Sequence, residues 1–326
     1  MRYNAIWQRW AAALSIALAG VAAVPAGAAE QITLGNVGQA SANLWPVLIG
    51  LDQGFYTAED LKVDVVYVQS SAALVQQVTA GSLPVSVSTG LADPLRAVGM
   101  GAPISIVRLE VQMPPYDLVA KPNIASLADL KGKLISLGGP KDITRIYVER
   151  MLAPSGVKPG DFDMVFAGAT AARASALAAG AVDAAILLPA FNFQAVAKGF
   201  KSLGLTADYV KDLPFSGMAV NNAWAGANKP TLEKLLRVEN KSIAWFNDPK
   251  NHADAVRILK AASGLSDDDV EKAYTFFHNG NFFELTGKVS RTRLNNLAKA
   301  MESLGDLPGD LDVNKAVLPG ITQMSD

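Results

Sequence analysis

The chain of 326 residues contains no cysteine. Disulfide bonds, thiolate nucleophiles, thiolate metal sites and a lipid attached through a thioether are therefore excluded. Histidine is nearly absent too, since His252 and His278 are the only two, and both fall in a predicted helical tail where a structural role is common. No G-x-S-x-G, H-E-x-x-H or P-loop motif occurs. Catalysis has little support, and we expect no catalytic residue, no metal ion and no cofactor.

An excess of charge of one sign is also lacking, because 29 Lys and Arg residues stand against 30 Asp and Glu residues. No basic stripe appears, so nucleic acid is not an expected partner. Half of the residues are apolar, which is typical of a globular protein, and a chain of this length buries a large core without disulfides. A monomer is the default expectation.

The first 29 residues have the layout of a secretory signal peptide. Arg2 and Arg9 precede an apolar run from Ala11 to Val24, and Ala26-Gly27-Ala28 supplies the small residues of a cleavage site. The run is shorter than the roughly 20 residues that a membrane-spanning helix needs. An uncleaved N-terminal anchor is the alternative. We expect cleavage near Ala29 or Glu30 and an exported, soluble mature protein.

The rest of the chain alternates short apolar strands with amphipathic helices, which predicts an α/β fold with mostly parallel sheets. The pattern occurs twice, with corresponding strands about 100 residues apart. The first block has predicted strands at Ile32–Asn36, Val63–Val68 and Val85–Thr89 and helices at Leu44–Gln53 and Ser71–Ala80. The second has strands at Leu134–Leu137, Met164–Phe166 and Ala184–Leu188 and helices at Ile143–Ala153 and Thr170–Ala179. Two such blocks predict two similar lobes.

Proline-containing segments suggest where the chain passes between the lobes. We expect the crossings at Tyr116–Pro122 and Pro214–Asn221, because proline interrupts both helices and strand ladders. Lobe I then comprises residues 30–118 and 218–326, and lobe II comprises residues 119–217. The predicted helices after Asn228 have no sheet of their own, so we expect them to cover lobe I.

Ligands of open α/β sheets bind beyond the carboxyl ends of the strands, where helix N-termini point. Glycine, serine and threonine at these turns expose N–H and hydroxyl groups. Arg145 could bind a carboxylate or sulfonate through two parallel hydrogen bonds, and the rings of Trp45 and Phe215 could pack an apolar body. The candidate ligand-binding residues are Asn43, Trp45, Ser70, Ser71, Thr89, Gly90, Gly139, Thr144, Arg145, Thr170, Pro189 and Phe215.

Several of these residues also fit a purely structural role. Ser70 and its neighbour would serve as helix caps. Arg145 would pair with Glu149 one helical turn away, and Trp45 would fill a core. For Arg173, which follows another predicted helix start, a bracing role is favoured over ligand contact.

Three motifs resemble those of a known family. Trp45-Pro46, Gly54-Phe55-Tyr56 and Asp60-Leu61-Lys62-Val63 resemble the W-P, G-F-Y and G-L-x-V opening of periplasmic binding proteins for nitrate, taurine, aliphatic sulfonates and thiamine-pyrimidine precursors. Asp60 replaces the usual glycine. Further similarity lies at Leu127–Lys133 and Ala176–Ala185, and the resemblance extends over residues 32–221.

The resemblance implies a two-lobed type II periplasmic binding protein fold, in which each lobe is a mostly parallel sheet flanked by helices and a helical extension follows. It also implies partners, namely the membrane permease and ATPase of an ABC importer, and a small-molecule ligand held between hinged lobes. The absence of cysteine separates this chain from the cysteine-bearing pyrimidine synthases of the same fold family.

The predicted function is capture of a small organic anion, a sulfonate or carboxylate that could carry an aromatic body, by hinge closure. Three alternatives stay open at this point. The ligand could be a neutral pyrimidine-like or flavin-like precursor, the protein could be an exported enzyme on the same fold, or it could report ligand to a membrane sensor.

Overall fold

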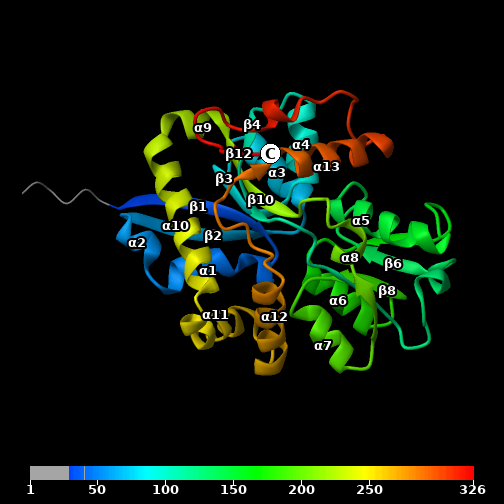
Figure 1. Cartoon of the computed structure of the whole chain (residues 1–326). Helices are drawn as coiled ribbons and strands as arrows, with labels where there is room; N and C mark the ends of the chain where they lie inside the picture. The colour runs from blue at the N-terminus through cyan, green and yellow to red at the C-terminus, as the bar shows by residue number, and fades with distance from the viewer. Residues whose placement is uncertain (1–28, 40) are drawn as a thin grey trace, which may run out of the picture.

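Two five-stranded sheets organise the chain, one in each lobe (Figure 1). The computed structural model describes residues 29–39 and 41–326, so the predicted signal peptide lies outside the described residues except for its last position. Each sheet is flanked by helices, and the predicted mostly parallel, two-lobed α/β architecture is confirmed.

The sheet of lobe I has the strand order β2-β1-β3-β10-β4. Strand β10 is antiparallel to both of its neighbours, whereas β1 pairs in parallel with β2 and β3. Strand β4 is buried along its whole length, which explains why it reads as a continuous apolar stretch. The strands are β1 (Glu30–Val37), β2 (Leu61–Val68), β3 (Val85–Gly90), β4 (Ile104–Val111) and β10 (Ser216–Asn221).

The sheet of lobe II repeats this plan with the order β7-β6-β8-β5-β9. Again the fourth strand in the order, β5, is antiparallel to its neighbours. The duplication that the sequence predicts is therefore confirmed, down to the reversed strand. The strands are β5 (Asp117–Ala120), β6 (Leu134–Leu137), β7 (Asp163–Phe166), β8 (Ala184–Leu187) and β9 (Lys201–Leu205).

Each of the two reversed strands directly follows a segment in which the chain passes between the lobes. Every residue of β5 lies in the sheet of lobe II, and every residue of β10 lies in that of lobe I. The boundaries drawn at 118/119 and 217/218 therefore cut through β5 and β10. We propose crossings a few residues earlier, at 112–116 and 211–215, where neither sheet has a strand.

The helices of the two duplicated blocks follow their strands as predicted. Ser70 begins α3 as an N-cap and Asp142 begins α5 in the same way, each accepting a hydrogen bond from a first-turn N–H group. In lobe I the helices are η1 (Ala42–Leu44), α1 (Trp45–Asp52), α2 (Phe55–Ala58), α3 (Ser71–Thr79) and α4 (Ala92–Gly99). In lobe II they are η2 (Leu127–Leu130), α5 (Ile143–Leu152), η3 (Ala153–Ser155), α6 (Thr170–Ala178), α7 (Phe191–Ala197) and α8 (Ala207–Val210).

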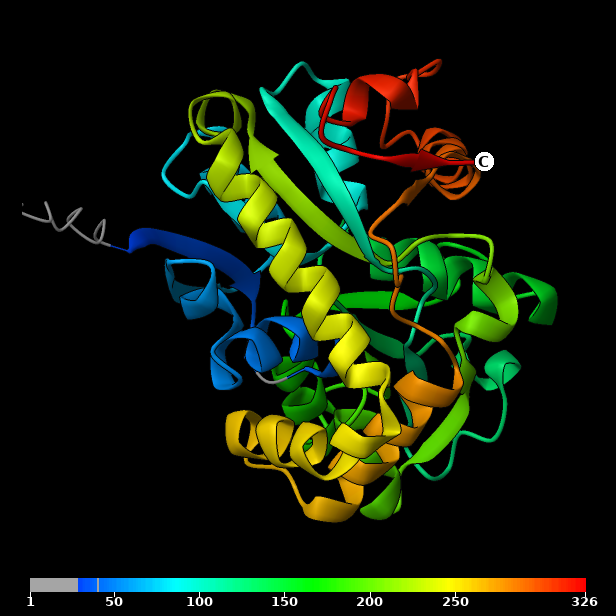
Figure 2. The same ribbon diagram turned by 60° about the vertical axis from the view of Figure 1, so that its left-hand side comes forward.

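The C-terminal helices cover lobe I, as expected, and one of them also reaches lobe II. The long helix α10 runs across lobe I (Figure 2), whereas Phe276 of α12 packs against Phe193 of α7, with ring centres 6.2 Å apart. The elements of this region are α9 (Asn222–Ala227), α10 (Lys229–Asn247), η4 (Pro249–Asn251), α11 (His252–Ser263), α12 (Asp267–Asn279), β11 (Val289–Ser290), α13 (Arg291–Ser303), η5 (Val313–Ala316) and β12 (Met324–Ser325).

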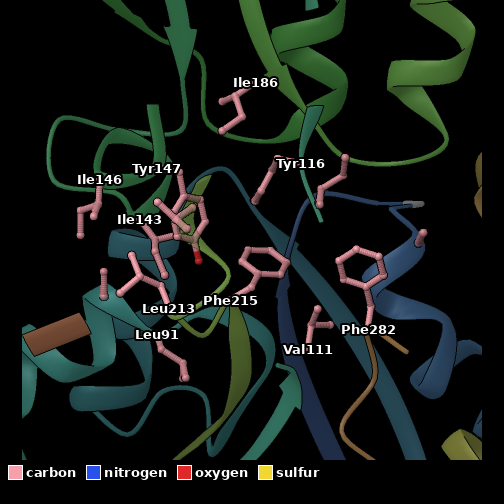
Figure 3. Packing of buried hydrophobic residues seen from close by; sticks show 14 of the residues in the cluster. Leu91, Val111, Tyr116, Ile143, Ile146, Tyr147, Ile186, Leu213, Phe215 and Phe282 are labelled. Carbon is pink, nitrogen blue, oxygen red and sulfur yellow. The ribbon is translucent and has the colours of Figure 1, made fainter. Parts of the chain in front are cut away.

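One hydrophobic cluster continues from lobe I into lobe II (Figure 3). Leu91 and Val111 come from lobe I, whereas Tyr147 and Ile186 come from lobe II, and all are buried. Phe215 lies among them, on the second crossing. The lobes are thus packed against each other in this structure rather than separated by an open cleft.

Candidate ligand-binding site between the lobes

A cavity of about 50 Å³ lies between the lobes, just beyond the carboxyl ends of parallel strands from both sheets. This is the position that the topology predicts. We call it the inner cavity. Its walls are Val37, Ser41, Asn43, Ser70, Ser71, Ser88 and Gly90 of lobe I, Tyr116, Gly138, Asp142, Ile143, Gly168, Ala169, Thr170, Arg173 and Leu188 of lobe II, and Phe215.

The N-termini of three helices, α3, α5 and α6, border the inner cavity. The first N–H groups of a helix have no partner within it, and they favour a negative charge. Ser70 Oγ accepts a hydrogen bond from Ala73 N in α3 at 3.2 Å, and Asp142 Oδ1 accepts one from Thr144 N in α5 at 2.9 Å. Helix α6 follows Ala169, whose side chain cannot accept a hydrogen bond. Of the three helices, α6 is therefore the one without a side-chain cap.

Arg173, in the first turns of α6, forms part of the cavity wall and is only 3% exposed. Its Nε donates to Ile186 O at 2.8 Å, its Nη2 donates to Thr170 Oγ1 at 2.8 Å, and its Nη1 donates to Gly168 O. The guanidinium carbon lies 5.7 Å from the ring centre of Tyr116. The favoured bracing role is correct, but the same side chain also borders the cavity.

Lobe I presents uncharged polar groups to the inner cavity. Asn43 and Ser88 are held together, because Ser88 Oγ donates to Asn43 O at 2.7 Å and Asn43 Nδ2 donates to Ser88 O at 3.4 Å. The buried Asn43 Oδ1 has no hydrogen-bond partner within the part of the chain that the structure describes. A buried amide without its full set of partners is a candidate for ligand contact.

An apolar wall closes the cavity beside these polar groups. Phe215 is buried and meets Tyr116 edge to face, with ring centres 5.0 Å apart. Figure 3 shows both rings with Tyr147 between the two lobes. The hydroxyl group of Tyr147 donates to Pro214 O at 2.5 Å, which fixes the second crossing against lobe II.

Two carboxyl groups face each other across the lobe boundary at the outer side of the cavity. Asp93 lies in the first turn of α4, and Asp142 is the N-cap of α5. Burial, together with the charge of Asp142, raises the pKa of Asp93 to about 6, while the paired Arg96 guanidinium opposes the shift. The lobes thus approach each other against a like-charge repulsion.

The two lobes are in close contact around the cavity at two glycines. A Cβ atom on Gly168 of lobe II would lie 2.2 Å from Gln69 O of lobe I, and one on Gly38 of lobe I would lie 2.6 Å from the Cβ of Ala169. Both glycines have φ near +68°, which other residues rarely adopt. The lobes therefore approach each other so closely here that no side chain larger than hydrogen fits at either position.

Trp45 does not reach the cavity, contrary to the prediction. It is completely buried, its Nε1 donates to Ala255 O at 2.7 Å, and its ring packs on Phe246 with centres 5.1 Å apart. The start of α1 turns this side chain toward the C-terminal helices. Trp45 is therefore a core residue of lobe I, the structural alternative that its neighbour Pro46 also permits.

The prediction also places Arg145 in the site, but the structure does not, since Arg145 does not border the inner cavity. Its Nε donates to Glu149 Oε1 at 2.8 Å, and its Nη1 donates to Pro140 O at 3.1 Å. The same Nη1 lies 3.5 Å from Asp306 Oδ2, beyond the end of α13. The side chain therefore links lobe II to the C-terminal region.

Three more predicted residues support the cavity without bordering it. Thr89 Oγ1 donates to Val87 O at 3.2 Å, and Thr144 Oγ1 accepts a hydrogen bond from Gly138 N at 3.0 Å. Pro189 O accepts a hydrogen bond from Ala42 N at 3.1 Å and so joins the two lobes. Gly139 borders a wider groove outside the cavity.

Half of the predicted residues do border the inner cavity: Asn43, Ser70, Ser71, Gly90, Thr170 and Phe215. The main residues that the prediction omits are Ser41, Ser88, Tyr116 and Arg173. Ser41 lies in a predicted strand-end loop and could have been included. Ser88 adopts φ +51° inside β3, and no sequence signal indicates such a conformation.

Both histidines lie in the C-terminal helices, as the sequence predicts. The ring of His252 stacks on that of Tyr274 with centres 4.3 Å apart, and the ring of His278 lies 5.4 Å from the same tyrosine. Within residues 29–39 and 41–326, no three His, Cys, Asp or Glu side chains are grouped as a metal ion would require.

Comparison with known proteins now decides the family. The sequence profile described as "NMT1/THI5 like" matches residues 41–252, about two thirds of the chain. The chain belongs to the NMT1/THI5-like family. No curated protein sequence is significantly similar to it.

Solved structures show that this NMT1/THI5-like protein has the type II periplasmic binding protein fold. The alkanesulfonate-binding protein SsuA from Xanthomonas axonopodis pv. citri, bound to MOPS, matches with a TM-score of 0.74 and 19% identity over 88% of this chain and 98% of that one. SsuA from Escherichia coli, an aliphatic sulphonate binding protein, gives 0.71 and 17% over 91% and 94%. The nitrate-binding protein NrtA from Synechocystis PCC 6803 gives 0.73 and 18% over 88% and 84%. The resemblance read from the sequence is confirmed, and at such identities the likeness concerns the fold.

Proposed function

We propose that this NMT1/THI5-like protein is the solute-binding component of an ABC importer and that it captures a small organic anion between its lobes. The anion would be a sulfonate or a carboxylate. One observation carries the proposal. Arg173 and the N-terminus of α6, which has no side-chain cap, lie together at the wall of a cavity that both lobes border.

The charged head group would lie in the inner cavity against α6. An exposed helix N-terminus stabilises a negative charge by about 0.3–1 kcal/mol, and by up to about 2 kcal/mol where it is partly buried. A hydrogen bond to a charged group contributes about 1.5–3 kcal/mol. Arg173 thus takes the role that the sequence analysis gave to Arg145, and the SsuA and NrtA structures lend support because their names describe proteins that bind anions.

Ligand capture would proceed by closure of the lobes. The cavity has walls from both lobes, so a ligand inside it makes contacts that an open arrangement lacks. Only such differential contacts shift the population toward the closed state. The polar groups of Asn43 and Ser88 would complete the enclosure from lobe I.

The predicted signal peptide supports a periplasmic location, and the family resemblance supports a permease and an ATPase as partners. In the part of the chain that the structure describes, no helix has the length and apolar character needed to cross a membrane. The proposed role is that of a binding protein and not of an enzyme. Anions incubated with the protein should therefore remain chemically unchanged.

Isothermal titration calorimetry with methanesulfonate, acetate, benzoate and the neutral compound 4-aminopyrimidine tests the proposal. Arg173→Gln should weaken binding of the tightest anion at least tenfold, because the charge-assisted hydrogen bonds are lost. Arg145→Gln is the matched control and should change affinity less than threefold. Binding of the pyrimidine alone, or equal effects of both substitutions, would contradict the proposal.

A second pair of variants separates the ligand role of α6 from the bracing role of Arg173. Ala171 is exposed in the first turn of α6. Ala171→Asp adds a negative charge at this helix end, which suits the helix but repels an anion, whereas Ala171→Asn adds nearly the same volume without charge. Anion affinity should fall severalfold in the aspartate variant alone, with both variants as thermally stable as the parent.

A further inference from the structure

A second, larger hollow of about 780 Å³ opens outside the inner cavity along the lobe boundary. We call it the outer groove. Helices α3 and α4 of lobe I form one wall, and the 138–142 loop with Phe166 at the end of β7 of lobe II forms the other. Neither the family profile nor the comparisons assign an occupant to it.

The outer groove adjoins the inner cavity. Four residues, Ser70, Ser71, Gly138 and Asp142, border both. The inner cavity, at about 50 Å³, has room only for a compact head group. If an anionic head group lies in the inner cavity, a longer body attached to it can leave the cavity only past the four shared wall residues.

The surface of the outer groove is mostly apolar. Phe166 is 45% exposed, and Met100, at the end of α4, is 71% exposed, the highest exposure of a large apolar side chain among the described residues. Charged neighbours are already paired, because Arg96 binds Asp93 and Lys141 lies 3.4 Å from Asp306. The groove therefore offers apolar contact with few unpaired charges to desolvate.

The outer groove has walls from both lobes, so it exists in full only when the lobes are closed. A molecule that fills it gains contacts in the closed arrangement that it would lack in the open one. Apolar burial there would consequently drive closure as well as affinity.

We propose that the outer groove binds the apolar body of the ligand whose anionic head occupies the inner cavity. The substrate class is thus an amphipathic organic anion with an alkyl or aryl body, rather than a small inorganic anion. This inference rests on the proposed function and names its substrate class. A straight chain of about six to ten carbon atoms would use the groove, whose volume is in the usual range for organic ligands.

Calorimetric titration with straight-chain alkanesulfonates and alkanoates, from one to eight carbons, tests the inference. Affinity should rise about three- to fourfold for each methylene that enters the groove, because each buried methylene contributes about 0.8 kcal/mol. Octanesulfonate should also produce more compact lobes than methanesulfonate in X-ray scattering.

A tryptophan placed in the groove gives a more specific test. Gln76 lies on the exposed face of α3 that borders the groove and is absent from the inner cavity wall. Gln76→Trp should weaken octanesulfonate at least tenfold and methanesulfonate less than twofold. Tryptophan at the exposed Ala262 of α11 is the control for adding an indole to a helix surface and should change neither.

The outcomes separate the two proposals. If methanesulfonate binds and octanesulfonate binds no tighter, or if Gln76→Trp weakens both equally, the groove assignment is overturned while the anion proposal stands. If the parent protein binds no sulfonate and no alkanoate of any length, the proposed function itself fails. Chain-length dependence that disappears in Gln76→Trp alone supports both.

Discussion

The two lobes share one sheet plan but present different chemistry to the cavity between them. Lobe II contributes a guanidinium, that of Arg173, and a helix end without a side-chain cap. Lobe I contributes amide and hydroxyl groups, among them Asn43 and Ser88, while its nearby Asp93 is paired with Arg96. The duplication therefore fixes where the cavity lies and leaves the choice of side chains free. We infer a division of labour in which lobe II binds the charge and lobe I closes over it.

The largest expected effect comes from preventing the contact between the lobes. Gly168→Ala would place a Cβ 2.2 Å from Gln69 O, so the closed state would be strained. Such overpacking costs about 1–3 kcal/mol, which corresponds to about 5- to 150-fold weaker anion binding in calorimetry.

A control for this substitution is available in the same lobe. Gly180 has φ +75°, and a Cβ atom added there would meet no atom of the described residues within 4 Å, so Gly180→Ala carries the backbone strain without the clash. It should lower the melting temperature as much as Gly168→Ala does and leave affinity unchanged. Equal loss of affinity in both variants would show that closure does not depend on this contact.

A smaller effect is expected from lobe I, which presents uncharged polar groups to the cavity. Asn43→Leu removes an amide that faces the cavity from lobe I. The amide would reach the anion through an Nδ2 hydrogen, and Nδ2 already donates to Ser88 O at 3.4 Å, so anion affinity should fall about two- to tenfold, less than in Arg173→Gln. If calorimetry showed that Asn43→Leu weakens anion binding more than Arg173→Gln does, lobe I would bind the charge of the ligand and the proposed division between the lobes would be reversed.

The pH dependence of the protein's stability against unfolding should be a smaller effect still. Burial and the charge of Asp142 raise the pKa of Asp93 to about 6, above its ordinary 3.8. The closed protein then binds a proton more readily than the unfolded chain between these values, so its stability falls as pH rises from about 4 to 6. In Asp93→Asn this part of the decline should vanish, and melting temperatures measured across the range should differ from the parent in slope by a few degrees at most. A parent slope that matches the variant's would show that the pKa of Asp93 is not raised in the folded protein.

The smallest effect is expected for the contact between Arg145 and Asp306, which joins lobe II to the C-terminal region. Asp306 is buried, but its Oδ2 lies 3.5 Å from Arg145 Nη1, a long contact, and neither residue borders the inner cavity. Asp306→Asn should therefore alter affinity less than threefold, and a larger change would mean that the C-terminal region helps to hold the lobes closed.

The sequence predicted the architecture well because strands and helices leave periodic apolar patterns. The repeat of β1 to β3 as β6 to β8 is visible in this way, and so are the glycine and serine turns after the strands. Trp45 shows where this reasoning ends, since a tryptophan beside a proline suits a core and a ligand wall equally, and only packing against Phe246 distinguishes them.

The choice between Arg145 and Arg173 shows the same limit for the site. Each arginine lies near the start of a helix in lobe II, Arg145 in the third helical position of α5 and Arg173 in the fourth of α6. One residue turns a side chain by about 100° around a helix, so a small difference in phase decides which arginine faces the cavity. The contacts of Gly168 and Gly38 were unpredictable for a related reason, because they depend on the spacing between lobes that are far apart in sequence.

The central claim, that lobe II holds the charge and lobe I closes over it, is tested most directly by a crystal structure of the protein with bound octanesulfonate. The account predicts sulfonate oxygens within hydrogen-bond distance of the Arg173 guanidinium and the first N–H groups of α6, with Asn43 on the opposite side and the chain extending into the outer groove. A sulfonate group beside Lys141 or Arg145, with the inner cavity empty, would contradict it.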